Sequence, residues 1–301
     1  MRDGRRIALL LALALTISGC AATGQYAARS AYQPLQTDYK PQGLLEEIFY
    51  PSSEPGMVER RAFVYLPKDY NECDQLYPVF YLLHGARGNE CVWIEKGNLL
   101  HNIDSLTACG AMLPTIVVLP NANQYDDAAD YGNARLKSAL EAFYEVDGTV
   151  ESRFVEDVVR ATDSLFNTIP DKEHRAIAGM SIGAMQAIHL SANFPDTFGY
   201  VGMFSPMVHS FLKKGPDNSF YKKLDRKQAV QFADPPLLYL IMIGGMDFFQ
   251  PGIENWSKTL SRKGYNNEYL PARGGHEWYN WEAFCNEFMQ RLWKASAAPR
   301  P

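Results

Sequence analysis

Short, continuously apolar runs alternate with segments of helical periodicity along most of this chain. A continuous apolar run is typical of a strand buried on both faces, and apolar positions spaced three and four apart are typical of a helix that covers a sheet. The pattern predicts strands at residues 44–50, 59–66, 78–83, 114–119, 200–204, 236–243 and 267–270, a strand, turn and helix over 176–190, and helices at 98–109, 151–167, 253–263 and 278–294.

The order of these elements indicates the fold class. The first two strands are joined by a short turn rich in Pro, Ser and Gly, which favours an antiparallel start. The later strands alternate with helices, and such alternation predicts a mostly parallel central sheet with helices on both faces. We therefore expect one α/β domain over residues 44–295.

The first twenty residues have the pattern of an export signal. Arg2, Arg5 and Arg6 precede an apolar run over residues 7–17. This run is shorter than the roughly 20 residues that a membrane-spanning helix needs. The segment ends in Ile-Ser-Gly-Cys at Cys20, which resembles a bacterial lipobox, whose cysteine is lipidated. The alternative is an ordinary secretory signal that contains a cysteine by chance.

Both interpretations of the N-terminus predict export. Ala21 after the cysteine, by resemblance to Gram-negative lipoproteins, favours the outer membrane. Residues 21–43 are polar and lack periodicity, so we expect a flexible tether between lipid and domain. The lipid anchor is the only membrane contact that the sequence predicts.

Composition narrows the function classes. The chain has 301 residues, of which 47% are hydrophobic and 21% charged, with a formal net charge of −5. These values are typical of a globular protein, and the absence of a basic stretch argues against a nucleic-acid partner. Oligomeric state is left open.

The cysteines after Cys20 carry little functional information. Export permits disulfides, and four cysteines allow three pairings. None of them has metal-ligand spacing, so no metal is expected. Cys285 lies on an apolar helical face, which favours a buried free thiol. The four are Cys73, Cys91, Cys109 and Cys285.

One polar stretch interrupts the alternation of strands and helices. Residues 121–150 follow a predicted strand at its C-terminal end, where α/β folds place their binding sites. A loop of this length in a compact domain is usually functional or disordered. We expect one wall of a substrate cleft here, with a plain surface insertion as the alternative.

A candidate nucleophile follows the apolar run that begins at residue 176. Gly179, Ser181 and Gly183 match the Gly-x-Ser-x-Gly nucleophile elbow. A serine on a tight strand-to-helix turn has a strained backbone and an exposed hydroxyl, and side chains two residues before and after it would collide. The alternative is a simple turn flanked by glycines.

A serine nucleophile needs a base, and the base needs an acid that orients it. His276 follows two glycines just after the last predicted strand, and Asp247 follows the strand at 236–243. The chain order serine, aspartate, histidine is that of α/β hydrolases. Glu254 is the alternative acid if Asp247 only caps the next helix. The other histidines are expected to be structural (His189) or near the surface (His101, His174 and His209).

Acyl transfer also needs two N–H groups directed at the developing oxyanion. The residue after the nucleophile, Ile182, supplies one of them. The loop after the strand at 78–83 begins His84-Gly85, and we predict that the Ala86 N–H is the second donor. The alternative for His84-Gly85 is a strand-ending turn without a catalytic role.

Several motifs together resemble the putative-esterase family of α/β hydrolases over roughly residues 44–295. The family includes feruloyl esterases attached to xylanases, acetyl xylan esterases, S-formylglutathione hydrolases, siderophore esterases and mycolyltransferases. The Ala86-Arg87 pair and residues 121–150 depart from the family pattern and leave the substrate open. The matching segments are residues 81–85, Trp93, residues 116–121, residues 179–183 and residues 275–278.

The resemblance implies an α/β-hydrolase fold and a serine esterase without cofactor. Feruloyl or acetyl groups on plant cell-wall carbohydrate such as xylan are the expected substrates. The same-fold alternative is an acyltransferase, and the alternative from another class is a non-catalytic glycan-binding protein. The expected substrate-binding residues are Trp278, Trp93, Tyr125, Tyr131 and Arg87.

Overall fold

The computed structural model describes residues 35–53, 59–72, 74–123, 146, 148–208 and 219–294. Five of the residues singled out from the sequence, which include the lipidation site and two expected substrate contacts, lie outside these ranges: Cys20, Cys73, Tyr125, Tyr131 and His209. The same holds for the tether over residues 21–34 and for most of the predicted cleft wall over 121–150.

Eight strands form one sheet in the order β1-β2-β4-β3-β5-β6-β7-β8. The first strand pairs antiparallel with the second, the second antiparallel with the fourth, and all other pairs are parallel. The predicted mostly parallel sheet is therefore confirmed. The strands are β1 (Leu44–Pro51), β2 (Glu59–Leu66), β3 (Val79–Leu83), β4 (Ile116–Pro120), β5 (Arg175–Met180), β6 (Tyr200–Phe204), β7 (Leu238–Gly244) and β8 (Glu268–Ala272).

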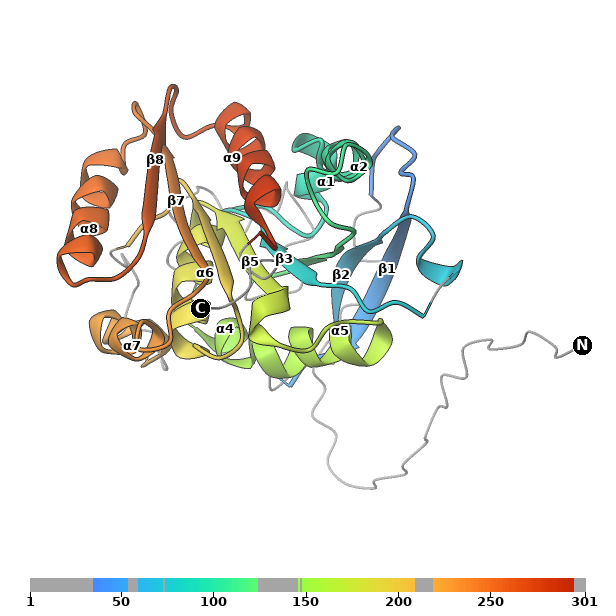
Figure 1. Cartoon of the computed structure of the whole chain (residues 1–301), viewed down its shortest axis with the longest axis horizontal. Coiled ribbons are helices and arrows are strands. Elements are labelled where there is room, and N and C mark those ends of the chain that lie inside the picture. The colour runs from blue at the N-terminus through green and yellow to red at the C-terminus, as the bar shows by residue number, and fades with distance from the viewer. Residues whose placement is uncertain are drawn as a thin grey trace, which may run out of the picture.

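Helices cover both faces of the sheet. Figure 1 shows α1, α2 and α9 on one face and α4, α5 and α6 on the other. Among the described residues, none of the helices combines the length and the apolar character that a membrane crossing requires. The helices are α1 (Val92–Lys96), α2 (Leu99–Ala108), α4 (Thr149–Phe154), α5 (Arg160–Leu165), α6 (Ile182–Asn193), α7 (Leu224–Gln231), α8 (Gln250–Arg262) and α9 (Trp278–Arg291).

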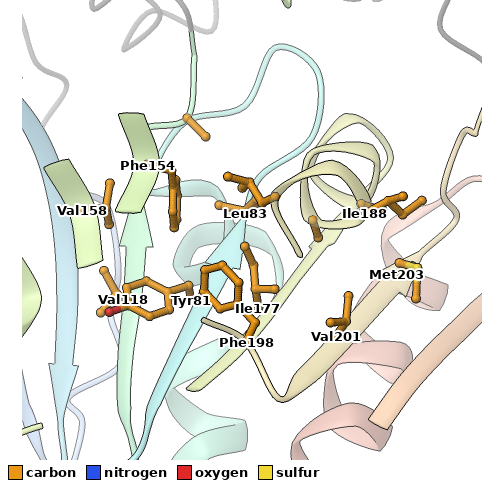
Figure 2. Packing of buried hydrophobic residues seen from close by; sticks show 14 of the residues in the cluster. Tyr81, Leu83, Val118, Phe154, Val158, Ile177, Ile188, Phe198, Val201 and Met203 are labelled. Carbon is orange, nitrogen blue, oxygen red and sulfur yellow. The ribbon is translucent and has the colours of Figure 1, made fainter. Parts of the chain in front are cut away.

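Two apolar layers hold the sheet between these helices. On the face that α6 covers, Tyr81, Ile177 and Val201 from three adjacent strands pack against Phe154 and Ile188, and all five side chains are buried (Figure 2). Full burial of one such side chain contributes about 1.5–3 kcal/mol. The central strands are therefore rigid, and their C-terminal ends give the loops that follow a fixed framework.

The strand order changes direction between β3 and β5, because successive strands are added on opposite sides of this pair. Ligands of open α/β sheets bind at such a switch point, beyond the carboxyl ends of the strands. In the register of the pair, Leu83 at the end of β3 lies beside Gly179 near the end of β5. The loop of the predicted oxyanion donor and the predicted nucleophile are thus neighbours.

The predicted tether ends earlier than the sequence indicated. The Tyr39 hydroxyl and the Gln42 backbone N–H both donate to Asp104 of α2, each at 2.8 Å, and the Tyr65 hydroxyl of β2 donates to the same carboxylate at 2.6 Å. Gln36 N–H also contacts Glu95 at 3.1 Å. Residues 35–43 therefore pack on the domain. These residues show no helical or strand periodicity because individual contacts with side-chain carboxylates hold them, and not the regular backbone hydrogen bonds of a helix or sheet.

The predicted helix over 151–167 is interrupted. It consists of α4, a π-helical turn at Val155–Val159 and α5. The side chain of Asp157 in this turn accepts the Ser53 N–H at 3.1 Å. The wider turn thus places a carboxylate against the end of β1, which periodicity alone does not predict.

Candidate active site

Ser181 occupies the turn between β5 and α6 with φ at 54° and ψ at −113°. A non-glycine residue in this region is strained by about 1–3 kcal/mol. The flanking glycines make the turn possible. A Cβ on Gly179 would lie 2.5 Å from the Gly183 carbonyl carbon, and a Cβ on Gly183 would lie 2.3 Å from the His84 carbonyl oxygen. Both positions therefore require glycine, because backbone atoms cannot move aside.

A chain of three side chains crosses the end of the sheet. His276 Nε2 lies 3.0 Å from Ser181 Oγ, and His276 Nδ1 lies 2.8 Å from Asp247 Oδ2. The three residues come from loops after β5, β7 and β8. In this geometry a neutral imidazole can take the hydroxyl proton while the carboxylate fixes its tautomer.

Asp247 is well placed to remain ionised. Burial acts to raise the pKa of its carboxyl group, but hydrogen bonds from His276 and from the Phe249 N–H outweigh burial and lower the pKa below its usual value. The Phe249 contact is 3.0 Å long and uses the other carboxylate oxygen. Glu254, the alternative acid, pairs with Lys258 on the surface and does not contact His276.

The His276 ring is fixed by its loop and by aromatic neighbours. Asn280 of α9 donates to the Gly275 carbonyl at 2.8 Å. The ring lies between Phe248, at a centroid distance of 4.9 Å, and Trp281, at 5.0 Å. These contacts restrict the imidazole to the orientation that joins Ser181 and Asp247.

The loop after β3 brings a second backbone amide to the nucleophile. A Cβ on Gly85 would lie 3.5 Å from the Ser181 Cβ, so this loop lies directly against the serine. Ile182 is the first residue of α6, where an N–H has no intrahelical partner. Within the described part of the chain, neither the Ala86 N–H nor the Ile182 N–H has a hydrogen-bond partner. Both are available to an oxyanion.

A pocket of about 660 Å³ opens in front of these groups. Trp278, Trp281 and Phe248 give it an aromatic wall, and Arg87 and Lys96 add two cations. Arg87 is exposed and has φ at 58°. The pocket is lined by Gly85, Ala86, Arg87, Gly88, Val92, Lys96, Met180, Ser181, Phe248, His276, Glu277, Trp278 and Trp281.

The sequence matches the model of a protein family described as Putative esterase over residues 53–239. The chain belongs to this family. Membership places it among the carboxylic ester hydrolases with an α/β-hydrolase fold. The predicted family and fold class are therefore confirmed.

Curated relatives carry xylan-related names. An endo-1,4-beta-xylanase/feruloyl esterase of Xylanibacter ruminicola is 28% identical over 84% of this chain and 32% of the relative. Endo-1,4-beta-xylanase Y of Acetivibrio thermocellus is 30% identical over 48% of this chain and 12% of the relative. This esterase thus spans a third or less of each of these longer proteins.

Solved structures agree on the fold. The ferulic acid esterase of the anaerobic fungus Anaeromyces mucronatus has a TM-score of 0.65 at 22% identity, covering 90% of this chain and 99% of that one. An S-formylglutathione hydrolase from Agrobacterium tumefaciens has a TM-score of 0.60 at 19% identity, covering 85% and 98%. At these identities the likeness shows the α/β-hydrolase fold alone.

One expected substrate contact of this esterase needs correction. Trp93 is only 1% exposed, and its indole N–H donates to the Leu83 carbonyl at 3.0 Å. Its ring lies edge-on to Trp278 at 5.4 Å. Trp93 therefore supports the pocket wall from behind and does not line the pocket, because α1 turns its side chain towards the sheet.

The pocket also contains residues that sequence reasoning missed. Phe248 and Lys96 were not predicted, although Phe248 directly follows Asp247 and Lys96 ends the first helix after the oxyanion loop. Proximity to predicted catalytic residues was the signal that could have found Phe248. Lys96 had no such signal, because α1 itself was not predicted.

His189 and the described cysteines do not line the pocket. His189 is buried, and burial lowers its pKa to about 3, so it is neutral as a core residue. Cys91 and Cys285 are buried free thiols, as predicted for Cys285, and Cys109 is free and exposed. Within the described part of the chain, no three His, Cys, Asp or Glu side chains are grouped to hold a metal ion.

Proposed function

We propose that this protein is an exported serine esterase that removes feruloyl or acetyl groups from plant cell-wall carbohydrate such as xylan. The observation that carries the proposal is the contact of Ser181 with His276, at 3.0 Å, inside a pocket with an aromatic wall. The hydroxyl has its base in place, and the wall suits a planar acyl group.

The proposed reaction proceeds through an acyl-enzyme. Ser181 Oγ attacks the ester carbonyl carbon while His276 Nε2 accepts the hydroxyl proton. The N–H groups of Ala86 and Ile182 stabilise the oxyanion. The C–O bond then breaks, and the alcohol leaves with the proton from His276. Water, deprotonated by the same histidine, attacks the acyl-enzyme and releases the acid and the free serine.

Two independent observations favour a feruloyl ester of xylan: the first bears on the carbohydrate and the second on the acyl group. The relative from Xylanibacter ruminicola is named both a xylanase and a feruloyl esterase. The pocket wall contains Trp278, Trp281 and Phe248, which offer flat apolar surfaces beside the nucleophile. An aromatic contact adds about 0.5–1.5 kcal/mol beyond area burial. Two contacts with a cinnamoyl ring would then give roughly a tenfold to hundredfold preference over an alkyl group.

We expect kcat/KM for methyl ferulate to exceed that for a matched methyl alkanoate by at least about tenfold. Steady-state kinetics on the two esters measure this ratio, and acetylated xylan is assayed in parallel. Trp278→Leu should reduce the ratio because it removes part of the aromatic wall. Equal values, or a preference for the alkanoate, would replace feruloyl by acetyl as the proposed acyl group.

Tyr279→Leu is the matched control for Trp278→Leu. Tyr279 is the next residue of α9, is 78% exposed and does not line the pocket. Its replacement should leave the ratio of the two kcat/KM values unchanged. A drop of similar size in both variants would mean that the ratio reports the stability of α9 and not ring stacking.

We also propose that Cys20 is the lipidated N-terminus of the mature protein, which anchors it to the outer membrane. The motivation is the sequence Ile-Ser-Gly-Cys after a short apolar run. Two acyl chains give stable anchoring, which one chain does not. Cys20→Ser should abolish incorporation of labelled palmitate and release the protein from the membrane fraction. Unchanged labelling would show that Cys20 is not the lipidated residue.

A further inference from the structure

His84 is a buried histidine at the end of β3 that does not belong to the Ser181, His276 and Asp247 chain. Its side chain bridges two loops. Nδ1 lies 2.9 Å from the Gly85 carbonyl oxygen, and Nε2 lies 3.0 Å from the backbone nitrogen of Ala122. His84 is only 4% exposed, so both contacts are shielded from water.

These two contacts fix the protonation state of the ring. The Gly85 carbonyl can only accept, so Nδ1 carries the proton, and the Ala122 N–H can only donate, so Nε2 is unprotonated. Burial lowers the pKa of His84 to about 4, with a smaller contribution from the positive charge of Arg60. His84 is therefore a neutral imidazole at neutral pH that donates at one nitrogen and accepts at the other.

The Gly85 carbonyl is held from two sides. It accepts from His84 Nδ1 and also from the Gly88 N–H at 3.0 Å. This carbonyl belongs to the same peptide group as the Ala86 N–H. In a trans peptide the C=O and the N–H point in opposite directions. Holding the carbonyl towards His84 and Gly88 therefore turns the Ala86 N–H the other way, towards the pocket that Ala86 and Ser181 line.

We propose that His84 is a positioning residue that holds the Gly85–Ala86 peptide with its N–H directed at the oxyanion, so that the oxyanion hole is formed before substrate binds. This inference rests on the proposed acyl transfer at Ser181. Without His84, the Gly85 carbonyl keeps only the Gly88 N–H as a donor. The Gly85–Ala86 peptide then rotates more easily and can present its carbonyl oxygen to the pocket, where it would repel the oxyanion.

The other end of the bridge is itself fixed to the nucleophile helix. The Ala122 carbonyl accepts from Gln186 of α6 at 3.0 Å. Asn123 donates to the Gly88 carbonyl at 2.8 Å, and Arg60 donates to the Asn123 carbonyl at 2.7 Å. The oxyanion loop, the segment after β4 and α6 thus form one hydrogen-bonded framework, with His84 as the link to the Gly85–Ala86 peptide.

Two amide substitutions separate the two contacts of His84. Asparagine has an amide nitrogen near the position of Nδ1 and can still donate to Gly85, but it cannot reach Ala122. Glutamine has an amide oxygen near the position of Nε2 and can accept from Ala122, but it loses the donor to Gly85. The proposal assigns the catalytic effect to the Gly85 contact.

We expect His84→Asn to keep kcat for 4-nitrophenyl acetate within about fivefold of wild type. His84→Gln should lower kcat by about 10²-fold, because one misplaced oxyanion donor costs about 10²–10³ in rate. KM should change less than about twofold in both. Affinity for phenylboronic acid, which forms a tetrahedral adduct with an active-site serine, should fall in parallel with kcat. Equal kcat values for the two variants would overturn the proposal.

His189→Gln is the matched control, because His189 is another buried, neutral histidine but lies within α6 away from the oxyanion loop. It should leave kcat near the wild-type value, so a loss of kcat comparable to that of His84→Gln would overturn the proposal. Nitrogen-15 NMR of histidine-labelled wild-type protein gives a test that needs no variant. His84 should show a protonated Nδ1 and an unprotonated Nε2 at pH 7, and the reverse tautomer would contradict the proposal.

These outcomes separate this inference from the proposed function. If Ser181→Ala retains activity, the acyl transfer at Ser181 fails and the role of His84 fails with it. If Ser181→Ala is inactive but His84→Asn and His84→Gln behave alike, only the positioning role of His84 is wrong.

Discussion

Replacing Ser181 by alanine is expected to abolish ester hydrolysis while the protein stays folded. Ser181 supplies the attacking oxygen, and loss of the nucleophile in a serine triad costs about 10⁴-fold or more in kcat. The Oγ contacts His276, and no other hydrogen bond of this side chain is formed within the described residues. The free energy of unfolding should therefore change by less than about 1 kcal/mol.

Hydrolysis of 4-nitrophenyl acetate and urea denaturation measure the two effects. Ser191→Ala is the control, because Ser191 is a buried serine of α6, the helix that follows Ser181, and its hydroxyl donates to the Ile188 carbonyl. This control should retain wild-type kcat. If purified, folded Ser181→Ala kept a tenth of the wild-type activity, another residue would have to be the nucleophile.

Asp247→Asn is expected to lower kcat by about 10³–10⁴-fold with little change in KM. An amide in place of the carboxylate cannot stabilise the imidazolium that forms when His276 takes the serine proton. Its N–H₂ group can also donate to Nδ1, which moves the ring proton to Nε2 and blocks the base. The amide oxygen can still accept from the Phe249 N–H, so the turn before α8 remains supported.

Glu254→Gln is the control for the acid. Glu254 pairs with Lys258 at the surface of α8, and its pKa is lowered by that pair and by Gln250. We expect its kcat to stay within about twofold of wild type. A large loss in this variant together with an active Asp247→Asn would identify Glu254 as the acid after all.

The proposed oxyanion hole, the framework around His84 and the predicted triad all meet at the switch point of the sheet. The two loops that flank this point follow β3 and β5, which are paired in register. Short, buried strands fix where these loops begin. The loops themselves are then held by side-chain contacts such as those of His84 and Asn123. Donors that are held in place in this way stabilise the charge of the transition state without having to reorganise during the reaction.

The local pattern of apolar and polar residues was sufficient to predict most strands and helices. It was also sufficient to predict the chain order of the candidate catalytic serine, aspartate and histidine. The central strands were recognisable because strands buried on both faces need continuous apolar runs. The elbow was recognisable because the turn needs glycine two residues before and two residues after the serine. This steric requirement is visible in the sequence spacing. Two helices escaped prediction for physical reasons: α1 is very short, and α7 is mostly polar, so neither has a clear apolar period.

Other features were decided only by the tertiary structure. The burial of Trp93 behind Trp278 and the docking of residues 35–43 on Asp104 depend on which surfaces the fold brings together. The contact of His84 with Ala122 joins residues 38 positions apart, and the contact between Ser181 and His276 joins residues 95 positions apart. Local sequence determined which candidate residues stand at backbone turns, because steric clashes act between residues that are close along the chain. Only packing determined which of those residues meet, because distances across the sheet follow from strand order.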